Sequence, residues 1–146
     1  MKEVGLEIKN LNNLISRNFK NLPSIKLLNE ITGSNGYILS YLHHNENQII
    51  TQKSIEKTLG ITRSTASTIL SRMEKKELIV REILNNDCRK KQIKITEKGR
   101  SLVLQTETEI HLFDQKLISD FTLEEIELLF EMFRRIKKNV EGGNKI

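Results

Sequence analysis

TRSTASTILSRMEKK, residues Thr62–Lys76, has a helical pattern from which the rest of the chain can be placed. The spacing i, i+3, i+4, i+7 predicts a helix with one narrow buried stripe. The apolar residues at this spacing are Ala66, Ile69, Leu70 and Met73. The opposite face carries small hydroxyls and cations, with a single carboxylate, Glu74, near its end. Such a face can approach DNA closely and bind phosphates or base edges, although a surface helix rich in Ser and Thr is the alternative.

The preceding segment, Thr51–Leu59, predicts a short amphipathic helix, because Ile55 and Leu59 are four residues apart. Thr51 is suited to cap its start, and Gly60 to adopt the left-handed conformation at its end. Two helices joined by a short turn, the second with a basic and hydroxylic face, predict a helix-turn-helix whose second helix enters the major groove.

A β-hairpin is expected next. Leu78–Leu84 is rich in β-branched and apolar residues, and Gln92–Thr96 alternates apolar and polar residues. The intervening residues, 85–91, are turn-forming and cationic. A hairpin after a helix-turn-helix is a wing, and Gln48–Ile50 is a candidate short strand beside it.

Residues 61–99 resemble the MarR (multiple-antibiotic-resistance regulator) family of winged-helix transcription regulators. The resemblance rests on four segments: Arg63–Ser67 (RSTAS), Met73–Ile79 (MEKKELI), Asp87–Arg89 (DCR) and Ile95–Gly99 (ITEKG). Two positions depart from the family pattern. Glu77 replaces the usual glycine before Leu-Ile, which weakens the helix C-cap, and Cys88 stands in the middle of the wing motif.

The predicted DNA-binding surface has two parts. On the recognition helix we expect contacts from Arg63, Ser64, Thr65, Ser67, Thr68, Arg72 and Lys75. In the wing, the resemblance implies that Arg89 enters the minor groove and that Asp87 orients it or braces the wing. Lys90 and Lys91 add affinity for phosphates, and a merely solvated charged turn is the alternative.

Charge and composition support this interpretation. Residues 51–100 contain 13 Lys and Arg against 6 Asp and Glu, a net charge of +7, although the whole chain carries only +5. Such concentrated positive charge is typical of phosphate contact. The basic face lacks the aromatic and apolar side of a membrane-surface helix. No apolar run predicts a membrane span, and no signal peptide is evident, so a cytoplasmic location is expected.

The predicted fold is mainly α with a small β-hairpin (α+β), a single MarR-type domain over residues 1–146. Helices in residues 1–31 and 97–141 are expected to dimerise, 34–96 to form the winged helix-turn-helix lobe, and 142–146 to form a flexible tail. Residues 24–31 could be either a helix or a linker. The terminal helices have more apolar surface than a small lobe can cover, which favours a homodimer over simple padding of the monomer core. Thr122–Glu125 is a capping box for the last helix.

Three further groups are candidates for smaller roles. Phe19, Tyr37 and Tyr41 either line a small-molecule pocket, where relatives bind anionic phenolic compounds, or are ordinary core aromatics. Cys88, beside Arg89 and two lysines, is either an oxidation sensor or inert, and as the lone cysteine it forms no intramolecular disulfide. His43, His44 and His111 are candidate metal ligands. The side chains of adjacent histidines point in different directions on a helix, so no metal site is predicted.

The chain lacks a phosphate-binding glycine loop, a zinc-spaced Cys/His cluster and a nucleophile–base pair, so neither an enzyme nor a cofactor is expected. The sequence predicts a homodimeric DNA-binding regulator, acting as a repressor on a pseudo-palindromic double-stranded operator. A small ligand or oxidation would modulate it. The alternative is a winged-helix module for protein–protein interaction without specific DNA binding.

Overall fold

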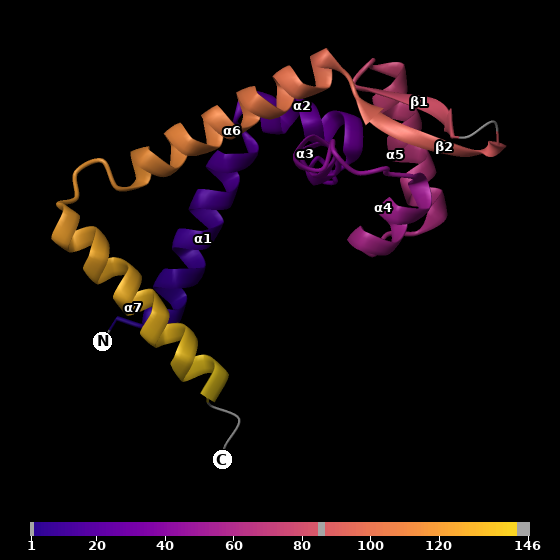
Figure 1. The fold of residues 1–146 in the computed structure, drawn as a ribbon. Helices are drawn as coiled ribbons and strands as arrows, with labels where there is room; N and C mark the ends of the chain where they lie inside the picture. Colours follow the sequence, from indigo (N-terminus) through magenta and orange to yellow (C-terminus); the bar gives the residue numbers. More distant parts are fainter. Residues whose placement is uncertain (1, 85–86, 143–146) are drawn as a thin grey trace. The chain divides into compact units, whose positions relative to one another are not determined.

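The computed structural model describes residues 2–84 and 87–142, apart from the side chains of Asp87 and Cys88. Within these residues it has seven α-helices and one two-stranded antiparallel hairpin (Figure 1). The predicted fold class, mainly α with a small hairpin, is therefore confirmed. The chain divides into two compact units, residues 1–110 and 111–146, with the boundary inside α6 (Glu97–Leu117).

The helix-turn-helix is formed by α4 (Gln52–Leu59) and α5 (Arg63–Lys75), as predicted. Thr51 and Ser54 form a reciprocal capping box at the start of α4, which satisfies backbone donors that have no partner inside the helix. Gly60 ends α4 with φ +63°, a conformation that glycine adopts without steric cost. The four apolar residues expected on the buried stripe of α5 are all buried.

The wing consists of β1 (Ile79–Leu84) and β2 (Asp87–Ile95), paired antiparallel with Ile79 opposite Ile95. The prediction of a turn over residues 85–91 is wrong in part, because β2 already includes Arg89, Lys90 and Lys91. Those three residues are exposed, so charged side chains can occupy a strand there at no desolvation cost. The short strand expected at residues 48–50 is reduced to a single bridge between Thr51 and Gln92.

Three helices precede the helix-turn-helix: α1 (Val4–Lys20), α2 (Pro23–Thr32) and α3 (Tyr37–His44). Residues 24–31, for which the sequence allowed either a helix or a linker, are helical. Pro23 occupies the first turn of α2, where its missing N–H costs nothing, and Gly33 ends the helix with φ +60°. The Glu109 carboxylate accepts a hydrogen bond from the backbone N–H of Ser24 at 2.8 Å, which fixes the start of α2 against α6.

The hydrophobic core of the first unit joins α2, α3, α4, α5, the base of the wing and the first half of α6. On α3 the buried residues are Ile38, Leu39 and Leu42, and neither Tyr37 nor Tyr41, the candidate core aromatics of this helix, is among them. Tyr37 is 45% exposed, and Tyr41 only packs against the edge of the core. The buried face of α3 is therefore rotated toward Leu39.

In the second unit, α7 (Leu123–Gly142) follows a turn at the end of α6. The predicted capping box is present: the N–H of Glu125 donates to the Thr122 hydroxyl, and the N–H of Thr122 to the Glu125 carboxylate. No residue of α7 is buried in this single chain. The same holds for α1 in the first unit, so both helices expose apolar side chains.

Candidate DNA-binding surface

The outer face of α5 presents the expected hydroxyls and cations to solvent. Thr65 is half-buried, and the other six predicted contact residues of this helix are exposed: Arg63, Ser64, Ser67, Thr68, Arg72 and Lys75. The helix start is ordered by the Thr62 hydroxyl, which accepts from the N–H of Thr65 at 3.2 Å. These side chains therefore project from a helix that is fixed at its N-terminus and along its buried stripe.

The C-terminus of α5 is held in a less usual way. The N–H of Leu78 donates to the Met73 carbonyl at 2.9 Å, and the N–H of Glu77 to the Glu74 carbonyl at 3.0 Å. This pair of bonds is a Schellman motif, which requires a left-handed residue after the cap. Glu77 takes that conformation with φ +62°, a position that normally favours glycine. The helix end thus has both capping bonds, with a non-glycine residue in the left-handed position.

Positive side chains from both predicted parts of the surface meet in one open groove of about 810 Å³, between α4, the start of α5 and the wing. Arg63 lines it from α5, and Arg89, Lys90 and Lys91 line it from β2. Among the described residues that line it, Glu56 is the only carboxylate. Such a groove is electrostatically complementary to a phosphate backbone. The hydroxyls farther along α5, with Arg72 and Lys75, lie outside it, and the side chains of Asp87 and Cys88 lie outside the described residues.

Three basic or amide side chains of this groove were not predicted as DNA contacts from the sequence. Gln52 and Lys53 extend it to the first turn of α4, where the Gln52 amide donates to the Arg63 carbonyl at 3.4 Å. Arg81 lines it from β1 and forms an ion pair with Glu74 of α5 at 3.3 Å. The cationic first turn of α4 was visible in the sequence. The direction of Arg81 depends on the strand register, which the sequence does not specify.

A second cavity, of about 410 Å³, lies between α1, α2, α3 and α6 within the first unit. Phe19 and Tyr37 line it, but Tyr41 does not, so the predicted set of aromatic residues is corrected at that position. Its wall is mainly apolar, and Lys20 and Glu107 provide its charges. The Glu107 carboxylate also contacts His44 Nε2 at 2.6 Å, which links this cavity to the end of α3.

The histidines do not form part of a larger acidic or thiol cluster. His44 pairs with Glu107, and the ring of His43 lies edge-on to that of His44, with 5.0 Å between ring centroids. Across residues 2–84 and 87–142, no three His, Cys, Asp or Glu side chains are grouped as metal ligands. None of the helices in the described part of the chain is both long and apolar enough to cross a bilayer.

These features define a class: winged helix-turn-helix transcription regulators. A MarR family model matches residues 30–89. The MepR A103V mutant from a multidrug-resistant S. aureus clinical isolate is 30% identical, with 91% of this chain and 96% of that chain covered and a TM-score of 0.67. The chain therefore belongs to the MarR family.

Two further solved structures extend the comparison. MepR, a transcription regulator of the Staphylococcus aureus multidrug efflux pump MepA, is 28% identical over 90% of this chain and 97% of its own, with a TM-score of 0.73. The S. aureus MepR F27L mutant bound to an oligodeoxyribonucleotide is 23% identical over 96% of this chain and 99% of its own, with a TM-score of 0.75. At 23% identity, the likeness to the MepR F27L mutant shows a shared fold alone.

Proposed function

We propose that this chain is a homodimeric repressor that binds double-stranded DNA at a pseudo-palindromic operator in the cytoplasm. The observation that carries the proposal is the cationic groove in which Arg63 of α5 meets Arg89, Lys90 and Lys91 of the wing. The exposed hydroxyl face of α5 continues from this groove, and both parts of the surface can contact one duplex. A MepR variant with this fold has been solved bound to an oligodeoxyribonucleotide, which supports the same partner here.

Homodimerisation is supported by the uncovered apolar side chains of the terminal helices. On α1, the side chains of Val4, Leu6 and Leu11 are each at least half exposed. On α7, Leu123 is 79% exposed and Phe130 is 67% exposed. Burial of one large apolar side chain contributes about 1.5–3 kcal/mol, so a second copy that covers these helices gains a large stabilisation. Two-fold symmetry places two recognition helices in successive major grooves, about 34 Å apart.

Regulation by a small molecule is supported by the apolar cavity beside Phe19 and Tyr37. Its volume suits a small aromatic compound, and Lys20 is available for an anionic group. A ligand that binds one arrangement of the lobes better than another shifts DNA affinity by that difference. Oxidation of Cys88 is the second proposed signal, because the residue belongs to the wing.

The test is a titration of the purified protein with the DNA immediately upstream of its own gene, beside a random duplex, at two salt concentrations. Upstream-selective binding that falls steeply with salt and weakens in Arg63→Ala and Arg89→Ala establishes the proposal. Arg134→Ala, which removes an exposed cation of α7, is the matched control and leaves affinity unchanged. Equal weak binding of both duplexes, or affinity only for an acidic protein, supports the interaction-module alternative instead.

A further inference from the structure

The loop between α3 and α4 is attached to the wing at two separate points. At its C-terminal end, the backbone N–H of Ile93 in β2 donates to the Ile50 carbonyl at 2.7 Å, beside the bridge between Thr51 and Gln92. The side chains of Ile50 and Ile93 are buried in the core beside this bond. One point of contact does not by itself fix the angle between two segments.

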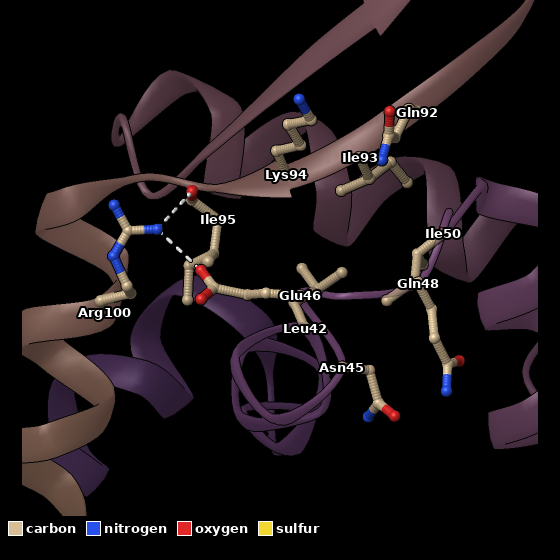
Figure 2. Close-up of a pocket in the computed structure, with 10 residues that line it drawn as sticks. All are labelled: Leu42, Asn45, Glu46, Gln48, Ile50, Gln92, Ile93, Lys94, Ile95 and Arg100. Atoms are coloured by element: carbon tan, nitrogen blue, oxygen red, sulfur yellow. Dashed lines mark hydrogen bonds and ion pairs between the residues drawn. The ribbon is translucent and has the colours of Figure 1, made fainter. Parts of the chain in front are cut away.

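The second attachment is a side chain at the start of α6. Arg100 Nη1 donates to the Glu46 carboxylate at 2.7 Å and to the Ile95 carbonyl, at the end of β2, at 3.4 Å (Figure 2). Its Nη2 donates to Glu97 at 3.1 Å. One guanidinium thus joins α6, the end of the wing and the loop after α3, and its hydrogen bond to Glu46 raises the pKa of Arg100.

A crevice of about 250 Å³ separates the two attachments, as Figure 2 shows. Buried Leu42, Ile50 and Ile93 line it, with the polar side chains of Gln48 and Gln92 nearer its rim. Ile50 and Ile93 are buried in the core at one end of this space. The ion pair of Arg100 with Glu46 joins the loop to α6 at the other end.

We propose that Arg100 is a positioning residue for DNA binding: it sets the angle of the wing relative to the loop that leads into α4. The proposal rests on the proposed function, since it concerns how the wing meets DNA. Without Arg100, the wing retains the Ile93–Ile50 bond and its packed junction with α5 and α6, so only small rotations of the hairpin relative to the loop become possible. Arg89 lies four residues beyond Ile93, about 13 Å along the strand, so a rotation of about 10° moves it by about 2 Å. That displacement exceeds the tolerance of a hydrogen bond to DNA.

The same geometry separates this role from a role in stability. Arg100 and Glu46 are both more than one third exposed, and exposed ion pairs contribute little to folding because water screens them. Arg100→Gln and Glu46→Gln therefore fold with nearly unchanged thermal midpoints. Each weakens binding of the upstream DNA about three- to tenfold. Arg134→Gln is the control, because Arg134 pairs with Glu131 on α7 in an exposed ion pair that is not part of the wing.

Double variants identify which contacts Arg100 acts through. If it positions the wing, adding Arg100→Gln to Arg89→Ala causes little further loss, because the wing contact is already absent. Added to Arg63→Ala, the same change retains its full effect, because α5 is fixed independently by its buried stripe. Full additivity with both, or no loss in either single variant, overturns the proposal. Failure of the wild-type protein to bind DNA selectively is a different result, which overturns the proposed function.

A second measurement needs no DNA. Spin labels at Lys57→Cys in α4 and Lys90→Cys in the wing, in a Cys88→Ser background diluted with unlabelled protein, report the distance between the two elements. We expect a narrow distance distribution that broadens in both Arg100→Gln and Glu46→Gln. A distribution that stays unchanged in both variants overturns the proposal whatever the DNA titration gives.

Discussion

Gly99, in the first turn of α6, packs so closely on the carbonyl oxygen of Leu78 that a β-carbon at position 99 would overlap it. The same β-carbon would lie 2.6 Å from Ile95 Cγ1. Thr96 reinforces this junction, because its hydroxyl donates to the Glu77 carbonyl at 2.6 Å and accepts from the N–H of Gly99 at 3.0 Å. The end of α5, both strands of the wing and the start of α6 therefore meet at one tightly packed point.

Gly99→Ala is expected to lower the free energy of unfolding by about 1–3 kcal/mol, because a backbone carbonyl cannot move aside as a flexible side chain does. Urea denaturation measures the change. Gly5→Ala on α1 is the matched control: its β-carbon meets nothing within 4 Å, so helix propensity alone should make that variant slightly more stable. Equal stability of the two variants contradicts the packing argument.

Glu77→Gly is expected to stabilise the protein by about 1 kcal/mol. Glu77 holds a left-handed conformation (φ +62°) that costs a residue with a side chain about 1–2 kcal/mol, and glycine's greater freedom in the unfolded chain offsets part of the gain. Thermal unfolding detects the gain as a higher midpoint. Glu77→Ala serves as the control, because alanine has the same steric conflict and should show no gain.

Much of the fold follows from local patterns that the sequence displays. The stripe of α5, the cap at Thr51 and the capping box at Thr122 involve residues within a few positions of each other, so spacing alone predicts them. Contacts between distant segments were not predictable in this way. The pairing of Arg81 with Glu74 depends on strand register, and that of Arg100 with Glu46 joins residues 54 positions apart.

Lys53→Ala is expected to weaken binding of the upstream and random duplexes by a similar factor. Lys53 lines the cationic groove from the first turn of α4, where a cation meets the phosphate backbone and reads no sequence. The slope of log affinity against log salt should fall by about 1, as for the loss of one phosphate contact. Lys57→Ala, an exposed lysine of α4 outside the groove, is the control. A loss confined to the upstream duplex would indicate base recognition instead.

Phe130→Glu is expected to shift the protein from dimer to monomer. Phe130 is 67% exposed on α7 and belongs to the apolar side of a helix with no buried residue in the single chain. A charge buried in a dimer interface without a partner is strongly unfavourable, so the dimer dissociation constant should rise at least about 100-fold. Sedimentation velocity measures the change. Lys138→Glu, on the charged side of α7, should leave the dimer intact, and a monomeric wild-type protein would refute the dimer outright.

Ser40→Phe is expected to abolish the response to an effector while leaving DNA binding unchanged. Ser40 lies on α3 and lines the apolar cavity beside Phe19 and Tyr37, so a phenylalanine ring at position 40 occupies the space that a ligand needs. Salicylate, a small aromatic anion, is the probe, and release of upstream DNA as its concentration rises is the measurement. Ser40→Ala enlarges the cavity slightly and should keep the response. If salicylate acts equally on wild type and Ser40→Phe, it binds elsewhere. If it has no effect on the wild type, the proposal of a small aromatic anion as effector is wrong.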